Sequence, residues 1–315
     1  MKLAFNARQR TFSLFAALLL ILSLFGGCAE QQQNVNPLLW KVTSPEGQVL
    51  HLFGSIHAAE EDLYPLPDYI NGAFDSSGAL AVEADIVAIE SDYTAMAEMS
   101  VQMMYADGQT IAGEIGAELH EKAKAVMADL EEELALGVPL SMLDMFRPAM
   151  WVSALENVAA KRSGLQMEFG LDRHFLTEAK ARNMEILEVE SVAEQTAMLV
   201  GFSAPLQAML LESALEVDAN VNGLKALYLL WKMGNEDLLA ASIEGDTEDM
   251  PDGLSAEYES AMMTQRNIKM ADAAKRYMSE GKNVFFVVGL GHMLGEDGIV
   301  SLLKKDGYTV ETLNG

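Results

Sequence analysis

The sequence predicts an α/β fold with a mixed, mainly parallel central sheet and a large helical insertion. Two observations support this prediction. Short β-rich runs near both ends of the chain alternate with helical segments, a pattern typical of strands that are joined by helices. Between these runs, residues from about 87 to 183 read as helix throughout. The chain has 315 residues, half of them hydrophobic, which is enough for a large core.

The first 27 residues are typical of a lipoprotein signal peptide. The basic start MKLAFNARQR precedes the apolar run TFSLFAALLLILSLFGG, which ends in small residues. Cys28 follows this run, and LSLFGGC resembles the lipobox of bacterial lipoproteins, with Phe25 at a position that is usually leucine. We therefore expect lipidation at Cys28 and a polar tether over residues 28–37. The alternative is a buried or free thiol in a membrane-spanning helix.

The residues around this anchor also indicate a compartment. Cys28 is the only cysteine, so the exported chain would fold without an internal disulfide. Ala29 follows it in place of the Asp that is usually linked to retention in the inner membrane. The sequence thus predicts a periplasm-facing lipoprotein of the cell envelope, anchored by its lipid in the outer membrane. No later apolar segment approaches the roughly 20 residues that a membrane span needs.

The N-terminal part of the sheet is predicted from three β-rich runs. Residues 38–43 and 48–54, LLWKVT and QVLHLFG, flank SPEG and read as a β-hairpin. The segment PLPDYINGAFDSS begins with prolines and reads as a helix. Residues 79–85, ALAVEAD, read as the next strand, and the long helical region follows it.

The C-terminal part of the sheet begins at residues 184–190, MEILEVE. Several helices follow, among them GLKALYLLWKMG and SAEYESAMMTQRNIKMADAAKRYMSEG. The chain then closes with the strand NVFFVVG, the helix EDGIVSLLKKDG and the strand YTVETL. The helical region therefore splits one small sheet.

The charge of the chain is one-sided. Residues 1–27 hold three basic and no acidic residues, so the remainder has 21 − 3 = 18 basic against 47 acidic residues, a net charge of −29. Such a surface repels nucleic acid phosphates, which excludes nucleic acid as an expected partner. The acidity is more typical of solubility than of a dedicated binding patch.

Two turns of the same kind follow two of the predicted strands. The first is FGSIH, with Gly54 and His57, and the second is VGLGH, with Gly289 and His292. In both, Glu-Asp comes four and five residues after the histidine. We interpret these acidic pairs as first-turn residues of helices, where negative charge is favoured by the helix dipole.

Four predicted strands end in polar residues that could share one crevice. These residues are His57, Glu83, Glu190 and His292. In open α/β sheets, ligands bind outside the carboxyl ends of the strands. Two imidazoles and two carboxylates at that edge would form either a divalent-metal site or an acid–base cluster. Glu188 shares a strand face with Glu190 and could replace it.

Each of these residues also has a purely structural interpretation. Gly-x-x-His alone is a weak pattern, and a histidine after a strand is more often a loop or core residue; it is the repetition of the turn that favours a shared site. Other motifs fail. HEKAK lacks the second histidine of a zincin, and GFSAP lacks the final glycine of a serine hydrolase elbow. GLGHMLG has the wrong glycine spacing for a dinucleotide loop.

Roughly residues 38–313 contain, in order, the motifs LWKV, HLFGSIHAAEEDLYPLPDYINGAFDSSGALAVEAD, GLDRHFLTEAKARNMEILEVESVAEQ, QRNIKMA and FFVVGLGHMLGEDGIVSLLKKDGYTVETL. This ordered set resembles the TraB/GumN family, which includes the Tiki proteins. The resemblance implies a metal-dependent hydrolase fold related to the Tiki metalloproteases. In that family two Gly-x-x-His motifs are held essential, and Mn²⁺ or Co²⁺ supports peptide cleavage.

The resemblance also implies roles for individual residues. The two family motifs are the Gly-x-x-His turns described above. The family's acidic position after the second strand falls on Glu83, and its Leu-Glu falls on Glu190, with Val189 in place of leucine. Asp172 in GLD and Arg266 in QRN match as well. Asp172 is more typical of a helix cap than of a ligand. Arg266 is either a surface or ion-pair residue or one that neutralises a substrate carboxylate or an oxyanion.

These observations lead to a functional hypothesis. His57 and His292, with Glu83 or Glu190, would bind a divalent ion such as Mn, Co or Zn, with Fe also compatible. The remaining carboxylate would accept and return a proton, and Arg266 would stabilise the oxyanion during cleavage of a peptide or exported protein segment. Some family members are linked to restraint of peptide pheromone signalling, so peptide binding without cleavage is the alternative. A structural envelope protein is a third interpretation.

Overall fold

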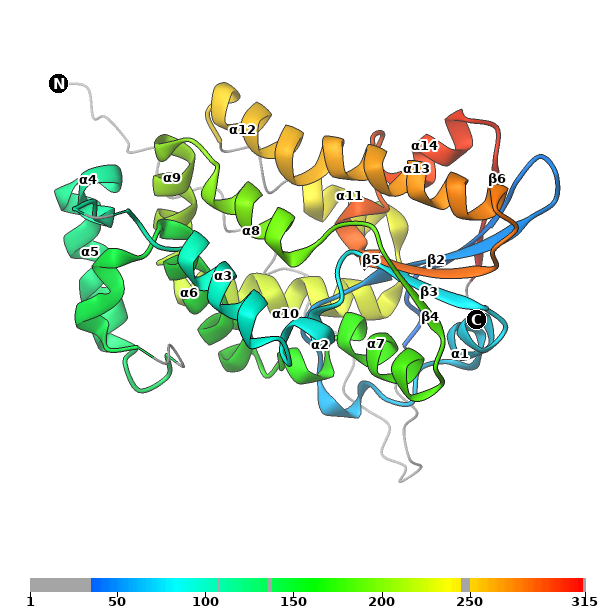
Figure 1. Cartoon of the computed structure of the whole chain (residues 1–315), viewed down its shortest axis with the longest axis horizontal. Helices are drawn as coiled ribbons and strands as arrows, with labels where there is room; N and C mark the ends of the chain where they lie inside the picture. Colours follow the sequence, from blue (N-terminus) through cyan, green and yellow to red (C-terminus); the bar gives the residue numbers. More distant parts are fainter. Residues whose placement is uncertain (1–34, 107, 135–137, 245–249, 314–315) are drawn as a thin grey trace, which may run out of the picture. The chain divides into compact units, whose positions relative to one another are not determined.

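A six-stranded mixed sheet forms the centre of the fold, with the strand order β4-β3-β5-β2-β1-β6 (Figure 1). Strands β4, β3, β5 and β2 are mutually parallel, and β1 is antiparallel to both β2 and β6. The predicted mixed, mainly parallel sheet is therefore confirmed. The strand bounds are β1 Leu39–Thr43, β2 Val49–Ser55, β3 Ala79–Val82, β4 Glu185–Glu188, β5 Val284–Gly289 and β6 Thr309–Leu313.

The computed structural model describes residues 35–106, 108–134, 138–244 and 250–313. These residues belong to one compact unit, Val35–Gly315. The predicted signal peptide, Cys28 and most of the predicted tether lie outside the described residues.

The predicted hairpin is formed by β1 and β2, which pair from Leu39↔Phe53 to Thr43↔Val49. Its turn contains Gly47 at a φ of +90°, a conformation that favours glycine because it has no Cβ. The C-terminal strand β6 adds to the other side of β1, so the two ends of the described chain are joined in one sheet.

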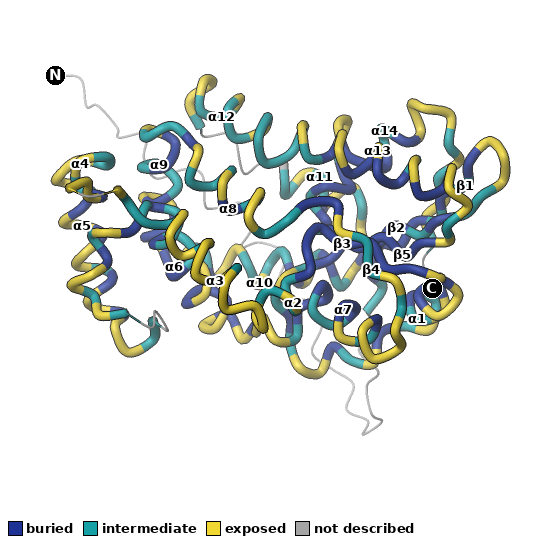
Figure 2. Tube along the Cα trace, viewed as in Figure 1, coloured by how far each residue is buried: buried dark blue, intermediate teal, exposed yellow. Residues whose placement is uncertain are grey.

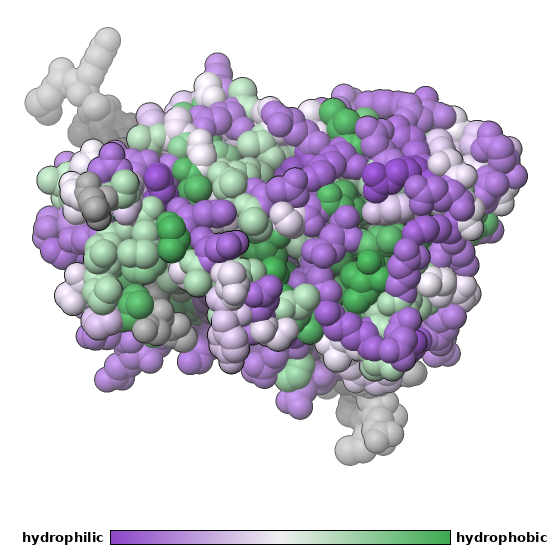
Figure 3. All heavy atoms as spheres, viewed as in Figure 1, coloured by the Kyte–Doolittle hydropathy of each residue, from purple (hydrophilic) through white to green (hydrophobic). Residues whose placement is uncertain are grey.

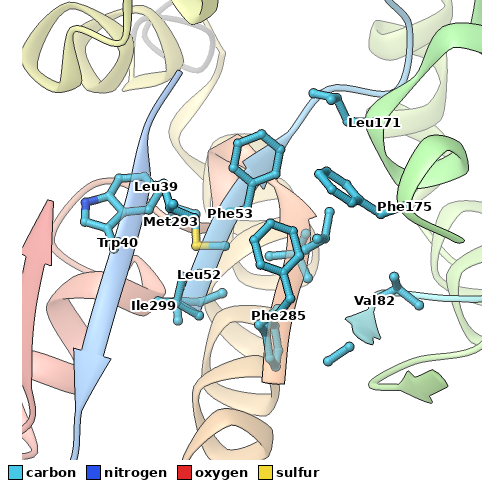
Figure 4. Packing of buried hydrophobic residues seen from close by; sticks show 14 of the residues in the cluster. Leu39, Trp40, Leu52, Phe53, Val82, Leu171, Phe175, Phe285, Met293 and Ile299 are labelled. Atoms are coloured by element: carbon cyan, nitrogen blue, oxygen red, sulfur yellow. The ribbon is translucent and has the colours of Figure 1, made fainter. Parts of the chain in front are cut away.

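One face of the sheet is covered by aromatic side chains from three helices, α1 (Asp68–Asp75), α7 (Leu171–Ala181) and α10 (Val217–Met233). The ring of Phe53 on β2 lies 5.5 Å from Phe175 of α7 and 6.3 Å from Trp231 of α10. Figure 4 shows Phe53, Phe285 and Phe175 packed together on this face. Burial of a large aromatic contributes about 1.5–3 kcal/mol, so this face fixes α7 on the sheet.

The opposite face is covered by α13 (Gln265–Ser279) and α14 (Ile299–Lys305). The ring of Tyr277 on α13 lies 6.3 Å from Phe286 of β5. Leu52, Met293 and Ile299 are fully buried on this side (Figure 4). The sheet therefore lies between two helical layers, which explains why β3 and β5 are almost entirely apolar.

The remaining helices form most of the predicted helical insertion and the segment before α13. Before β4, these are α2 Ile86–Ile89, α3 Tyr93–Gln102, α4 Ile111–Ile115, α5 Ala117–Asp129 and α6 Pro148–Ser163. After β4, they are α8 Val192–Val200, α9 Ala204–Ala214, α11 Glu236–Glu244 and α12 Asp252–Tyr258, which runs through a π-helical turn, η7 (Glu259–Thr264), into α13. Short 3₁₀ turns lie at η3 Glu61–Leu63, η4 Leu140–Met145, η5 Met167–Phe169 and η8 Leu290–His292.

Helix α6 shows how the sequence sets these boundaries. Pro148 occupies its first turn, where the missing N–H has no intrahelical acceptor to lose. Gly164 ends the helix at a φ of 87°, and its N–H donates to the carbonyl of Lys161.

A second hydrophobic core lies among the helices. It contains Trp151 and Leu155 of α6, and also Leu211 of α9 and Val221 of α10, which follow β4 in the chain. Within the predicted insertion, α7 instead packs on the strands β3 and β4. The central strands β3 and β5 are buried, whereas the edge strands β4 and β6 and the helix α3 are largely exposed or half-buried (Figure 2). Hydrophilic residues cover much of the face drawn in Figure 3, with hydrophobic patches among them.

One prediction about the turns is wrong in part. The first Glu-Asp pair does begin a short helix, because Glu61 and Asp62 lie in the first turn of η3. The second pair, Glu296 and Asp297, lies in a turn before α14 and not in its first turn, because the N-cap of α14 is Gly298.

Among the described helices, none alone has the length and apolar composition of a membrane span. The helices α8 and α9 meet these criteria only when taken together, and they are bent by 101° at the break between them.

Candidate active site

Four neighbouring parallel strands bring the four predicted residues to one edge of the sheet. Along the order β4, β3, β5, β2, the residues that follow the strands are Glu190, Glu83, His292 and His57. Val82 pairs with Val287, and Ser55 pairs with Gly289, so the strand ends are level with one another. The structure therefore assembles these four side chains at the carboxyl edge, where α/β sheets bind ligands.

The two carboxylates are tied together by a guanidinium and an amide. Nη2 of Arg266, on α13, donates to Oε2 of Glu83 at 2.6 Å and to Oε2 of Glu190 at 2.9 Å, and its Nε lies 3.0 Å from Oε1 of Glu190. The amide of Gln195, on α8, donates to Glu83 at 3.0 Å and to Glu190 at 3.1 Å. The three charged side chains are only 5–11% exposed. Arg266 is therefore an internal counter-ion rather than a surface residue.

Glu83 is held in its ionised form. Burial alone would raise its pKa, but the charges of His292, His57 and Arg266 and the N–H of Gly289 outweigh burial and lower the pKa to about 2. The N–H of Gly289 donates to Oε1 of Glu83 at 2.7 Å. At neutral pH this carboxylate is consequently a stable anion and a weak proton acceptor.

His292 is buried and oriented by a neighbour on α13. Its Nδ1 lies 2.6 Å from Oδ1 of Asn267, and its Nε2 lies 3.8 Å from Oε1 of Glu83. Burial lowers the pKa of His292 to about 4, although the charge of Glu83 opposes this shift. The imidazole is therefore neutral, with its Nδ1 proton donated to Asn267 and its Nε2 lone pair directed to the crevice.

His57 is the exposed member of the cluster. Its Nδ1 lies 2.8 Å from Oδ2 of Asp172, and the side chain is 61% exposed. Ser55 donates to the other oxygen of Asp172 at 2.7 Å. The charge of Asp172 and its hydrogen bond raise the pKa of His57 to about 9. Asp172 is therefore a positioning residue for His57 and does not cap α7 through its side chain.

The glycines of the repeated turns have separate steric roles. A Cβ on Gly54 would lie 2.5 Å from Cδ1 and 3.2 Å from Cα of Leu290, so the first turn packs directly on the second. A Cβ on Gly289 would lie 3.3 Å from Oε1 of Glu83, where the carboxylate now accepts the backbone N–H. Glycine therefore permits the close approach of the two turns and of Glu83.

Sequence reasoning missed several residues that complete the site. Gln195 and Asn267 lie within two of the family-like motifs, VESVAEQ and QRN, but the sequence alone assigned neither residue a role. Gly170 allows α7 to approach the first turn, because a Cβ there would overlap the carbonyl oxygen of His57. Glu188 does not join the cluster: it is exposed and accepts the N–H of Asp85.

The residues present fit a divalent metal in part. In both histidines Nδ1 faces a side-chain oxygen, which is the outer hydrogen bond that orients metal-ligating imidazoles through Nε2. Oε1 of Glu83 faces Nε2 of His292, so His57, His292 and Glu83 could hold an ion. Across residues 35–313, apart from the gaps noted above, no three acidic, His or Cys side chains already form a ligand group. Arg266 bonds Glu190 and Oε2 of Glu83, so Oε1 of Glu83, which also accepts the N–H of Gly289, is the carboxylate oxygen left for an ion.

The fold and this cluster define an α/β protein with a histidine–carboxylate site at the carboxyl edge of its sheet. The sequence profile of the TraB/PrgY/gumN family matches residues 38–312. The chain belongs to the TraB/PrgY/gumN family, as the motif order predicted.

Named relatives support this assignment. The chain is 24% identical to the uncharacterized protein YbaP of Escherichia coli (strain K12) over 264 residues, which cover 84% of this chain and 90% of YbaP. It is 23% identical to human metalloprotease TIKI1 over 89% of this chain and 63% of that protein. It is 22% identical to metalloprotease TIKI2 of Xenopus tropicalis over 90% of this chain and 61% of that protein. No solved structure is significantly similar to the chain.

Proposed function

We propose that this chain is a metal-dependent hydrolase that cleaves peptides or exported protein segments. The observation that carries the proposal is the pairing of two histidines, each held at Nδ1 by a side-chain oxygen, beside the ionised Glu83. Its similarity to two metalloproteases supports a peptide substrate.

His57, His292 and Oε1 of Glu83 would hold the ion, which when bound supplies Lewis acidity and lowers the pKa of a coordinated water. The low pKa of Glu83 suits a ligand better than a general base. Glu190 has both oxygens in hydrogen bonds with Arg266, so we assign it to positioning rather than to proton transfer.

Arg266 combines an ion-pair role with the oxyanion role proposed for it. Its Nε and Nη2 hold the two carboxylates, and Nη1 makes one weak bond of 3.3 Å to the carbonyl of Met262. Nη1 is therefore the guanidinium nitrogen left to donate to a substrate oxygen, while Nε and Nη2 orient the two carboxylates.

The test is the metal content of the purified chain beside His57→Ala and His292→Ala, with a thermal melt on each. We expect a near-stoichiometric transition metal in the parent and its loss in both variants without unfolding. His120→Ala is the control, because His120 pairs with Asp144 in the helical part. Peptide cleavage would then be measured with Mn²⁺, Co²⁺ and Zn²⁺. Absence of metal binding at any concentration would refute the proposal.

A second candidate function is peptide binding without cleavage. The observation that favours it is the ion pairing of both carboxylates with Arg266, which satisfies them without a metal. This function would give peptide retention that is insensitive to chelator and to His292→Ala.

We also propose that the chain is anchored in the cell envelope through Cys28. The support is the sequence LSLFGGC after an apolar run. Mass spectrometry of the mature N-terminal peptide should show a lipid on Cys28, and Cys28→Ser should leave an unprocessed precursor. An unmodified Cys28 in a processed chain would contradict the anchor.

A further inference from the structure

A cavity of about 290 Å³ adjoins the cluster on the side of β4. Its walls come from α8, from the π-helical turn η7 and from the first turns of α13, and α8 runs below α12 and α13 in the view of Figure 1. Glu190, Gln195 and Arg266 line the cavity and also bond to the cluster. A group in the cavity would therefore be separated from Glu83 by a single layer of side chains.

The charges that line this cavity are balanced. Glu190 is paired with Arg266, and Glu194 is paired with Lys269 at 3.1 Å. The two acidic and two basic side chains of the lining are each paired, with Arg266 also serving Glu83, so a charged ligand group would meet no unpaired partner of opposite charge. An uncharged group is favoured.

Two amide oxygens in the cavity receive no hydrogen bond from the described residues, Oε1 of Gln195 and Oε1 of Gln265. The Nε2 of Gln195 donates to two carboxylates of the cluster, so of the two amides it is the one fixed beside Glu83. Met198 and Ala261 supply the apolar part of the lining. The cavity therefore combines a hydrogen-bond acceptor, Oε1 of Gln195, with an apolar surface formed by Met198 and Ala261.

We propose that this cavity is a substrate subsite that binds one uncharged side chain with an O–H or N–H donor, namely Ser, Thr, Asn or Gln, next to the reacting bond. This inference rests on the proposed function, because it places the substrate against the same cluster. The donor bonds Oε1 of Gln195, and the aliphatic part of the side chain contacts Met198 and Ala261.

The experiment is affinity selection from a random peptide library on the purified chain, with cleavage products read by mass spectrometry in the same samples with Mn²⁺. Ala261→Trp fills the cavity, and Met198→Trp fills it from the opposite wall. The matched control is Ala193→Trp, an exposed position on α8 outside the cavity. We expect enrichment of the four residue types at one position, lost at least about tenfold in the filled variants and kept in the control.

A charge change gives a readout that altered stability would not produce. Lys269→Glu makes the lining net negative, so the preference should move to Lys and Arg at that position. Lys269 is an exposed residue that makes no contact with Glu83 or the histidines.

The outcomes separate this inference from the proposed function. Peptides that are retained with the expected preference but are not cut would support the subsite and refute hydrolysis. Cleavage with no preference, or with one unchanged in Ala261→Trp and Lys269→Glu, would refute the subsite and support hydrolysis. Neither retention nor cleavage would overturn both.

Discussion

Replacing Arg266 by Met tests whether the guanidinium holds the site together. The substitution removes the hydrogen bonds to Glu83 and Glu190 and leaves two carboxylates that are at most 11% exposed. Loss of one partner from a buried ion pair costs about 3–5 kcal/mol. For a domain of this size, at roughly 2 °C per kcal/mol, the midpoint of thermal unfolding should fall by about 6–10 °C.

Thermal unfolding followed by circular dichroism measures this shift. Arg276→Met is the matched control, because Arg276 lies exposed on the same helix and contacts only the ring of Tyr277 among the described interactions. Excess Mn²⁺ should raise the midpoint of Arg266→Met more than that of the parent, since the ion would then compensate the freed carboxylates. A midpoint within about 2 °C of the control would refute the assignment of Arg266 as the structural counter-ion.

Three further substitutions test the packing and charge of the site. Gly54→Ala would press on Cα of Leu290, at 3.2 Å, so we expect about 1–3 kcal/mol less stability in urea unfolding and weaker Mn²⁺ binding. The control is Gly72→Ala inside α1, which meets no atoms and should stabilise the chain by about 0.5–1 kcal/mol. Folding lowers the pKa of Glu83 from 4.5 to about 2, so ionised Glu83 stabilises the fold above pH 4.5 and this contribution is lost as the pH falls toward 2. Glu83→Gln should therefore reduce the dependence of the urea midpoint on pH between about pH 5 and 3. A variant whose midpoint falls as steeply with pH as that of the parent would contradict this. Asn267→Leu removes the acceptor of His292, so Mn²⁺ affinity in calorimetry should fall about 10–100-fold; retention of full affinity would show that the bond is not needed.

The fold was predictable because its signals are local. The central strands β3 and β5 are short apolar runs, and the alternation of strands with helices predicts a parallel sheet without any knowledge of partners. The predicted strands extended to residues 85 and 190, whereas the structure ends them at Val82 and Glu188. Backbone hydrogen bonds nevertheless continue between the two segments, from the N–H of Val189 to the carbonyl of Val82 and from the N–H of Glu190 to the carbonyl of Glu83, so the two carboxylates leave the sheet side by side.

The site was predictable only in the residues that follow strands. The carboxyl ends of parallel strands lie at one edge of a sheet, and this rule alone places four residues together: His57, Glu83, Glu190 and His292. Except for Gln195, which lies five residues after Glu190, their partners come from residues distant in sequence, and periodicity carries no information about which helical residue faces the crevice. The sequence shows that Arg266 is cationic, but only the tertiary structure shows that it forms ion pairs with two carboxylates, Glu83 and Glu190.

The charge balance of the crevice leads to a last prediction, about protons. Glu83, Glu190 and Arg266 together carry one negative charge, and beside them Asp172 raises the pKa of His57 to about 9, so His57 carries a proton, paired with Asp172, at neutral pH. A metal ion on Nε2 must displace that proton, so Mn²⁺ affinity should rise with pH up to about 9 and binding should release a proton. Asp172→Asn removes the anion that raises the pKa, and the rise in affinity should then end nearer the ordinary value of 6.5. Calorimetric titrations at several pH values, in two buffers of different ionisation enthalpy, measure both quantities. Affinity independent of pH between 7 and about 9 would show that the ion does not bind at His57.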